Sequence, residues 1–385
     1  MSPRSVLAEV NPAILRWARE TAGLELEQVA KRFGKVEEWE REHGQAKPTV
    51  RQLETLSDIY KRPLATFFLP EPPVEPPPPT DFRMLPSDRA RTLSKKVRLA
   101  MRKARRTQRL YTQLSAELTA THPRLPRIGM SDPERQARQI RGLLGIPIEN
   151  QLSWRDSYDA FRGWRAAMEA LGVLVLQLPM PVKEGRGFSL DEGSTPTIVV
   201  SSSDAITARI FTLFHELAHL LLNRIGLCTP DPTSPTQPSA QIEQFCNHFA
   251  GALLVPLDAV RAEGDLTQLP SSLGEMEERL VESAKAFKVS RYVILRRLLI
   301  ANYMSLEQFR RMMNKWAKEG EPTQRRGGGQ RPPARVLSQL GGRFVSLVLE
   351  AHGRGLITSS DVTSYLSLNL KYLGDVQRLV AHLRG

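Results

Sequence analysis

The most regular hydrophobic pattern in the chain lies between residues 203 and 222. Apolar side chains recur there every three or four residues, as on one face of an α-helix. They are Ile206, Ile210, Leu213, Phe214, Leu217 and Leu221. Ser203 and Asp204 precede the run and are residue types that often cap a helix. The pattern predicts an amphipathic helix that begins just after them.

A second helix is predicted from Ile242 to Leu254, ending near Pro256 because proline cannot continue a helix. The stretch between the two helices, from Cys228 to Ala240, is rich in Pro, Ser and Thr. Such a composition predicts a loop, and this loop is long enough to bring the second helix back beside the first.

Short apolar runs before the first helix predict three strands, at 173–177, 187–190 and 197–200. Helical spacing dominates elsewhere in the chain. The expected fold is therefore mainly α with a small β-sheet, an α+β arrangement.

Composition shifts divide the chain into segments. Seven prolines in the ten residues from Pro70 to Pro79 predict an extended spacer, and glycine and arginine dominate residues 325–331. The predicted organisation is a helical domain at 8–69, a proline-rich linker at 70–80, a central domain at 81–318 with its core at 155–300, a flexible linker at 319–333 and a helical C-terminal domain at 334–385.

The first predicted helix carries the sequence His215-Glu216-Leu217-Ala218-His219. Residues four apart project from one face of a helix, so the two imidazoles can occupy two corners of a tetrahedral zinc site. Glu216 lies about 100° further round the helix. From there its carboxylate can reach a water on the metal without being a ligand, which is typical of a zinc peptidase. The motif is short enough to arise by chance, so the surrounding pattern matters.

A catalytic zinc site with two histidines needs a third protein ligand and an open position. On the second predicted helix, Glu243 and Asn247 are four residues apart and share a face. Glu243 is a candidate third ligand. Asn247 is a candidate acceptor for the second ring nitrogen of a ligand histidine, a contact that fixes its tautomer.

The overall charge indicates an affinity for polyanions. The 385 residues have a net charge of +13 and a pI near 10.0. Ten Lys and Arg and no acidic residue lie between Arg89 and Arg109. This basic helix, 89–109, is either a solvated face or a nucleic-acid contact, and the sequence leaves both readings open.

Cysteine content and hydropathy bear on the compartment. Cys228 and Cys246 are the only cysteines, which argues against a disulfide framework and fits a reducing cytoplasm. No apolar run approaches the length of a membrane span, and no signal-peptide core is visible at the N-terminus. We expect a cytoplasmic protein without a membrane partner.

The metal region resembles the ImmA/IrrE metallopeptidases, relatives of the gluzincins. The matching positions are Arg209, Phe211-Thr212, the His-Glu-x-x-His segment, Glu243, Asn247, Phe249-Ala250 and Leu253-Leu254-x-Pro256. Cys246 and Phe245 depart from the family pattern, which often has alanine and glutamate there. The resemblance implies Zn²⁺ held by His215, His219 and Glu243, with Glu216 as the catalytic carboxylate. It also implies an edge strand that pairs with substrate, for which 196–201 or its hairpin partner is the candidate; a plain core strand is the alternative.

The N-terminal domain resembles an Xre-type helix-turn-helix, through Trp39, Pro48-Thr49 and Gln52-Leu53, with Thr49 and Gln52 predicted to form a capping box. Its second helix should read DNA, but the stretch 34–42 carries four glutamates, which phosphates repel. This domain therefore binds either DNA or a protein.

The sequence predicts a regulatory, site-specific zinc endopeptidase. By resemblance, its substrate is a protein such as a transcriptional repressor. Two alternatives stay open: a DNA-binding transcriptional regulator whose zinc fold is structural or sensory, and a toxin–antitoxin component. Tyr292, His248 and Arg209 are candidate donors to the oxyanion.

Overall fold

The computed structural model describes residues 6–74, 93–119, 124–191, 195–223, 227–228, 238–270, 272–319 and 330–384. The proline-rich stretch beyond residue 74, Arg89 and Arg91 of the basic run, most of the loop after Cys228, and the linker residues 320–329 lie outside these ranges. The chain folds into two compact units, Met1–Lys103 and Ala104–Gly385.

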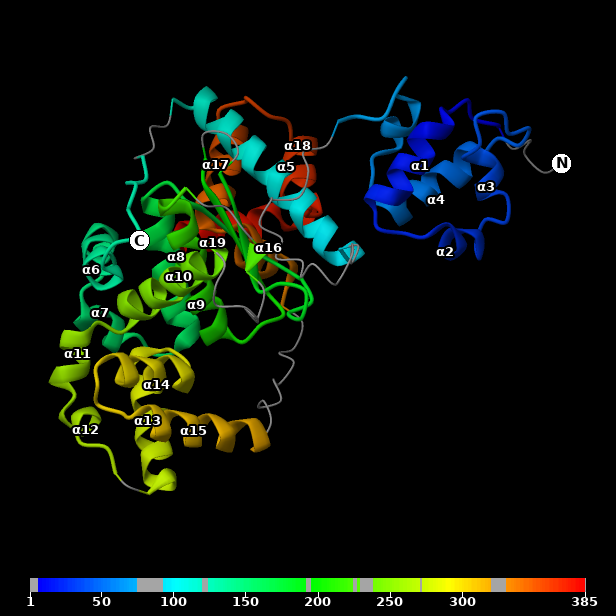
Figure 1. Cartoon of the computed structure of the whole chain (residues 1–385). Helices are drawn as coiled ribbons and strands as arrows, with labels where there is room; N and C mark the ends of the chain where they lie inside the picture. Colours follow the sequence, from blue (N-terminus) through cyan, green and yellow to red (C-terminus); the bar gives the residue numbers. More distant parts are fainter. Residues whose placement is uncertain are drawn as a thin grey trace. The chain divides into compact units, whose positions relative to one another are not determined.

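The first unit is a small helical bundle, drawn in blue in Figure 1. Its elements are α1 (Pro12–Thr21), α2 (Leu26–Ala30), α3 (Val36–Trp39), α4 (Val50–Tyr60), the 3₁₀ helix η1 (Leu64–Phe68) and the first turns of α5 (Lys95–Glu117). Thr49 and Gln52 form the predicted capping box at the start of α4. A buried ion pair between Arg19 and Glu40, 2.9 Å apart, ties α1 to the end of α3.

The start of α5 uses its basic side chains within this unit. Lys95 donates to the carbonyl oxygen of Ile59 at 2.7 Å, Arg98 to that of Glu20 at 3.0 Å and Arg102 to that of Tyr60 at 3.1 Å. These carbonyls belong to the last turns of α1 and α4, where orphan acceptors and the helix dipole favour a cation. Part of the basic run therefore stabilises helix ends.

The second unit contains the sheet and most of the helices. Before and within the sheet region come α6 (Pro133–Leu144), α7 (Ile148–Ser153), α8 (Ser157–Ala170), β1 (Leu174–Leu178), β2 (Gly187–Leu190), β3 (Thr197–Ser201), α9 (Ile206–Leu221), β4 (Leu227–Cys228) and α10 (Pro238–Leu254). After them come α11 (Leu257–Ala262), α12 (Gly264–Thr267), α13 (Leu273–Phe287), α14 (Arg291–Ile300), α15 (Leu306–Glu319), α16 (Pro332–Leu340), α17 (Gly342–Gly353), α18 (Ser359–Leu366), η2 (Leu370–Tyr372) and α19 (Leu373–Arg384). The fold is mainly α with a small sheet, as the sequence predicts.

The sheet has the strand order β1-β3-β2-β4. β1 is parallel to β3, while β2 is antiparallel to both β3 and β4. β3 is thus an interior strand with both edges paired. The expectation that 196–201 offers an edge to a substrate is wrong, because β1 and β2 occupy both of its edges. Its hairpin partner β2 is paired with β3 along its length and with β4 at Gly187 and Phe188, and both β2 and β3 lie against α9.

The start of α9 also differs from the prediction. The helix begins at Ile206, and its cap residue Ala205 makes no side-chain capping bond. Asp204 instead forms an ion pair with Arg186 at 2.8 Å, and its carbonyl oxygen accepts from Arg209. The local sequence favoured a cap, but a long-range ion pair takes the carboxylate.

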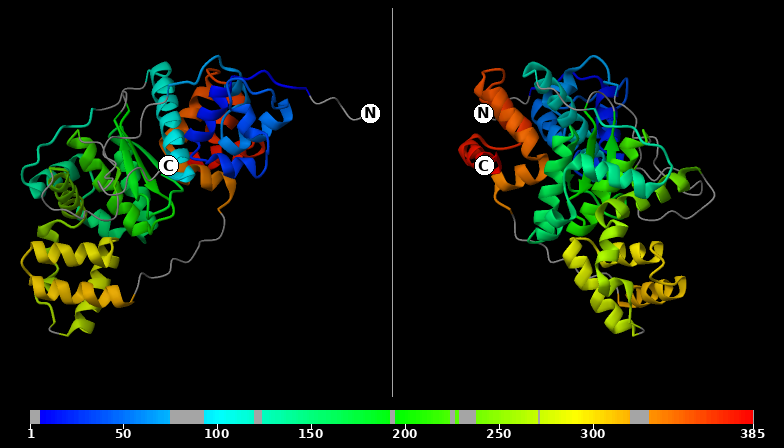
Figure 2. Two further views of the ribbon diagram at one scale, coloured as in Figure 1. Left: turned by 45° about the vertical axis from the view of Figure 1, so that its right-hand side comes forward. Right: turned by 90° about the vertical axis from the view of Figure 1, so that its left-hand side faces the viewer.

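The C-terminal helices are joined to the sheet by a buried ion pair. Arg165 and Glu169 of α8 lie 2.9 Å apart, and Arg165 also donates to the carbonyl oxygen of Ser338 at the end of α16. Gln177 of β1 donates to the same oxygen at 2.9 Å. The views in Figure 2 follow the C-terminal helices in orange and red.

Gly341 lies directly over this ion pair and should be intolerant of a side chain. Its φ is +86°, and a Cβ there would overlap Glu169 Oε1 and the Arg165 guanidinium. We expect Gly341→Ala to lower the free energy of unfolding by about 2–4 kcal/mol, since it adds backbone strain and disturbs a buried charge pair. Urea unfolding measures this. Gly353→Ala, with nothing within 4 Å of the new methyl, is the matched control and should not destabilise. Equal effects would contradict the account.

No helix in the described part of the chain combines the length and apolar character needed to cross a bilayer.

Candidate metal and catalytic site

Three side chains from two helices converge in the second unit. His215 and His219 project from α9, and Glu243 projects from the first half of α10. The two helices pack against each other along much of their length. Leu217 and Phe249, both fully buried, belong to the core cluster that holds them together. The apolar stripe of α9 therefore fixes the height and rotation of the two imidazoles.

The donor atoms form a compact triangle. The Nε2 atoms of His215 and His219 are 3.1 Å apart, and the Glu243 carboxylate oxygens lie 3.3 Å and 3.4 Å from them, respectively. Both histidines are buried, and the Glu243 side chain is 16% exposed. Glu243 is therefore the member of this donor group that is most accessible to solvent.

The triangle fits a tetrahedral cation. With bonds of about 2.0–2.1 Å, donors around zinc are about 3.3–3.4 Å from one another. The separation of 3.1 Å between the two Nε2 atoms is close to this value, and so is the distance from each Nε2 to one Glu243 oxygen, 3.3 Å from His215 to Oε2 and 3.4 Å from His219 to Oε1. Two imidazoles and one carboxylate are also the ligand set of many catalytic zinc sites. These three residues could hold a metal ion, with a fourth position left for another ligand.

Hydrogen bonds from residues of α10 orient the rings of His215 and His219. The Nδ1 atom of His215 lies 3.0 Å from Asn247 Oδ1, so it donates a proton there and leaves Nε2 free to bind a cation. Burial alone would lower the pKa of His219, but hydrogen bonds to Cys246 and Glu243 raise it to about 10. Cys246 is a contact that the family pattern, with alanine at this position, does not suggest. Positions 243, 246 and 247 all lie on one side of α10.

The Asn247 contact gives a direct test of this arrangement. Asn247→Ala removes the acceptor that fixes the His215 tautomer, so we expect the affinity for Zn²⁺ to fall by about 10–100-fold. Competition with a fluorescent chelator measures the change. Gln244→Ala, an exposed amide on the same helix, should bind zinc as the unaltered protein does. If both variants bind equally, Asn247 does not position His215.

Glu216 is not a member of the triangle but lies near its histidines, on the side of α9 that faces β2. It is fully buried, and neither carboxylate oxygen has a hydrogen-bond partner among the described residues. The Ser189 hydroxyl on β2 is close enough to lower the pKa but does not meet hydrogen-bond geometry. Burial dominates and raises the pKa of Glu216. A carboxylate so placed is a stronger base than one in water.

The close approach of β2 to α9 depends on Gly187. A Cβ at this position would lie 2.5 Å from Thr212 Cγ2 and 2.7 Å from the Val199 carbonyl oxygen, whereas Glu216 Cγ, at 3.5 Å, would be at an ordinary contact distance. Sequence periodicity marked 187–190 as a strand but gave no sign that it lies beside the catalytic candidate.

The three oxyanion candidates are placed elsewhere or already engaged. Arg209 donates to the carbonyl oxygens of Asp204 and Ser202 and to Gln177 Oε1. His248 Nε2 lies 2.7 Å from Glu134 Oε1. Tyr292 is on α14 and is 41% exposed. Arg209 and His248 therefore act as structural residues in this conformation.

Glu134 also binds Arg297, at 2.6 and 2.9 Å, and so joins α6, α10 and α14. Burial opposes ionisation of Glu134, but hydrogen bonds from His248 and Arg297 outweigh it and lower the pKa to about 2. Because the folded pKa is depressed, this carboxylate contributes stability above about pH 4.5 that is lost as pH falls toward 2.

We expect Glu134→Gln to flatten the pH dependence of urea unfolding in that window. An unchanged slope would contradict this assignment.

Residues 168–299 match the family model Peptidase_M78, described as an IrrE N-terminal-like domain. The matched segment runs from the end of α8 to α14 and contains the whole donor triangle. No curated protein matches the chain. The match supports a peptidase domain of the ImmA/IrrE type, in a family that is typically metal-dependent.

Proposed function

We propose that the protein is a zinc-dependent endopeptidase, with His215, His219 and Glu243 as zinc ligands and Glu216 as the general base. The observation that carries this is the buried, unpartnered carboxylate of Glu216 beside a triangle of three donors. A purely structural zinc site needs no such group, and burying a carboxylate without partners is costly.

Each residue then has a distinct task. Zinc, when bound, lowers the pKa of a water and polarises the scissile carbonyl. Asn247 holds the His215 ring so that Nε2 faces the cation. Glu216, whose pKa is raised by burial, accepts the proton of the attacking water and passes it to the leaving amine. β2 and Gly187 keep the carboxylate of Glu216 away from bulk solvent.

The substrate that we favour is a protein, and specifically a transcriptional repressor, so the enzyme acts as a regulator in the cytoplasm. The matched family supports a regulatory role in general terms. The first unit is the candidate for recognising that protein. Its short helix α3, at the position expected to read DNA, contributes Glu37 and Glu38, which suits a protein partner better than DNA.

Substrate trapping tests the proposal. The Glu216→Gln protein is used to capture interacting proteins from the native cell extract, and the captured proteins are then incubated with the unaltered enzyme. We expect one captured protein to be cut at a single bond, which end sequencing identifies. If the unaltered enzyme cuts no captured protein, the alternative of a binding protein with a structural zinc site is favoured.

A further inference from the structure

The edge of the sheet beside Glu216 is already paired within the chain. β4 is antiparallel to β2 and pairs with its outer edge at Gly187 and Phe188. It is the last strand in the order β1-β3-β2-β4. Along the chain it lies between α9 and α10, the two helices that carry the donor triangle. The protein therefore supplies a strand of its own at this edge.

The paired position is close to the catalytic candidate. Thr212, one turn before Glu216 on α9, has its Cγ2 atom 2.5 Å from the place where a Cβ of Gly187 would be, and Glu216 Cγ is 3.5 Å from that place. Two residues further along β2, the Ser189 hydroxyl lies near the Glu216 carboxylate. Glu216 itself is fully buried. A general base has to reach the water that attacks the substrate, so this conformation is a closed one.

Main-chain hydrogen bonds at a sheet edge are open to any strand that arrives there. An extended peptide that adds to an edge binds through its N–H and C=O groups, and side-chain pockets add the specificity. Where the edge is occupied, the incoming strand must first replace the resident one. A short resident strand makes few bonds and is easily replaced, and β4 has only two residues.

Part of the same edge is open. On its inner side β2 pairs with β3 over its whole length, Gly187 to Leu190, whereas β4 reaches only the first two of these residues. No strand of the described chain pairs with the outer edge of β2 at Ser189 and Leu190. An extended segment can begin to pair at these two residues and then replace β4 at the other two.

We propose that β4 is an autoinhibitory strand, which occupies the place of an extended substrate segment beside Glu216 until that segment displaces it. This rests on the proposed peptidase function and adds the regulation of the same site. Pairing begins at Ser189 and Leu190 and proceeds toward Gly187, which opens the site at Glu216. A substrate therefore needs an extended segment as long as β2, which has four residues. Proteins that offer no such segment leave the site closed.

Proline substitutions in β4 weaken its pairing selectively. In an antiparallel pair, every second residue directs its N–H group toward the partner strand. The double variant Leu227→Pro, Cys228→Pro therefore loses a bond to β2, whichever of the two residues makes it. The loss of one main-chain bond changes an equilibrium by about fivefold. The double variant Leu227→Ala, Cys228→Ala keeps both N–H groups and is the matched control.

Hydrogen exchange of the full chain gives a readout that does not depend on cleavage. We expect the outward-facing amide of β2 to exchange at least about fivefold faster in the proline variant than in the alanine variant. Amides of β3, which pair with β1 and β2, should exchange alike in both variants. Equal exchange of β2 in the two variants would show that β4 does not hold this edge, and the proposal would fall.

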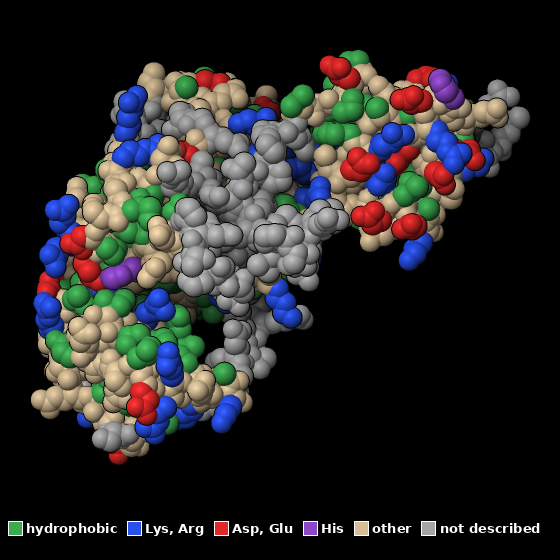
Figure 3. Space-filling view, viewed as in Figure 1, with side chains coloured by type: hydrophobic (Ala, Val, Ile, Leu, Met, Phe, Trp, Pro, Cys, Tyr) green, Lys and Arg blue, Asp and Glu red, His purple; other side chains and the backbone are tan. Residues whose placement is uncertain are grey.

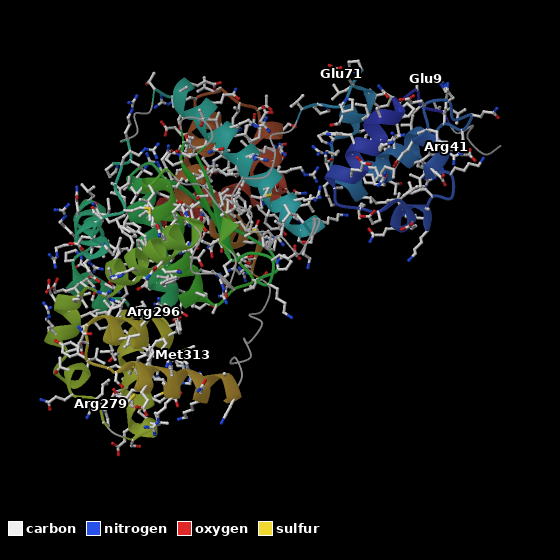
Figure 4. All side chains as sticks on the ribbon, in the orientation of Figure 1. Glu9, Arg41, Glu71, Arg279, Arg296 and Met313 are labelled. Carbon is white, nitrogen blue, oxygen red and sulfur yellow. The ribbon has the colours of Figure 1, made fainter. Side chains whose placement is uncertain are left out.

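Binding of a peptide to the zinc-loaded protein measures the competition directly. The probe is an extended peptide that carries a hydroxamate, a zinc-binding group. Figure 3 shows Lys and Arg side chains spread over the second unit with Asp and Glu among them, so an uncharged peptide avoids binding to surface charge. We expect the proline variant to bind the probe at least about fivefold more tightly than the alanine variant and to cut the trapped substrate faster. Arg296→Ala, which changes an exposed side chain of α14 labelled in Figure 4, should bind as the unaltered protein does.

A second measurement needs no variant. When the unaltered protein binds the probe, the amides of β4 should exchange faster, because that strand has been displaced, while β2 stays protected by the peptide. Continued protection of β4 in the complex would overturn the proposal. So would weaker binding of the probe to the proline variant, since β4 would then be the strand on which the peptide is seated. If no variant cuts any protein, the peptidase function fails, and exchange and probe binding still decide the role of β4.

Discussion

Replacing Glu216 by glutamine should abolish peptide hydrolysis while leaving zinc in place. The amide has nearly the same shape as the carboxylate but cannot accept the proton of the attacking water. Because general base catalysis contributes about 10²–10⁴-fold, the rate of cleavage should fall by at least about 100-fold. Neither oxygen of Glu216 has a hydrogen-bond partner among the described residues, so the change breaks no structural contact there. Zinc content by mass spectrometry and cleavage of the trapped substrate are measured on the same preparation.

A control for this variant is Glu350→Gln, an exposed carboxylate on α17, which should cut at the normal rate. Glutamine at 216 also removes a buried charge, and we therefore expect the variant to be at least as stable as the unaltered protein. Cleavage at the normal rate by Glu216→Gln would remove Glu216 from the mechanism. Loss of zinc from that variant would instead make Glu216 part of the metal site.

Removing Glu243 should have the second large effect, on metal binding and stability. Glu243→Ala leaves only the two histidines of α9. Loss of a contact outside the ligand set typically lowers metal affinity by about 10–100-fold. Because Glu243 is itself a proposed ligand, its loss should lower the affinity for Zn²⁺ by more than this. A cation at about a thousand times its dissociation constant stabilises a fold by about 4 kcal/mol. A chelator should therefore lower the Tm of the second unit by about 10 °C, and it should have almost no effect on Glu243→Ala.

Glu134→Gln is the control for this second variant. Glu134 also contacts α10, through His248, but it lies outside the donor triangle. That variant should lose stability and still release the same amount of zinc to the chelator. If the chelator shifts the Tm of Glu243→Ala as much as that of the unaltered protein, the metal is bound elsewhere.

The spacing of residues along the chain was sufficient to predict those parts of the site that lie on a single helix or strand. His215 and His219 must share a face, because four residues make about one helical turn. The strands predicted at 187–190 and 197–200 follow from short apolar runs and agree with β2 and β3 to within one residue, and the capping box at Thr49 follows from two residue types at a fixed offset. In each case the determinant lies within a few residues along the chain.

Interactions between distant segments could not be obtained in this way. The ion pair of Asp204 with Arg186 replaces the expected helix cap, and the strand order depends on the pairing of β3 with both β1 and β2. The basic run looked like a single surface, yet Lys95 and Arg98 bind helix-end carbonyls. Such outcomes depend on which partners the folded chain brings close, and side-chain type alone does not encode them.

The placement of Glu243 lies between these two cases. Its helix and its face, shared with Asn247, follow from sequence, but the distances of 3.3 and 3.4 Å to the imidazoles depend on how α10 packs on α9. The proximity of Ser189 and Gly187 to Glu216 is of the same kind, because it arises from the packing of β2 on α9.

The most direct test of the zinc site is a crystal of the protein measured on both sides of the zinc absorption edge. The account predicts one anomalous peak per chain, about 2.0–2.2 Å from the Nε2 atoms of His215 and His219 and from a carboxylate oxygen of Glu243. A zinc-supplemented crystal with no peak between α9 and α10, or with its peak at another cluster, would contradict it.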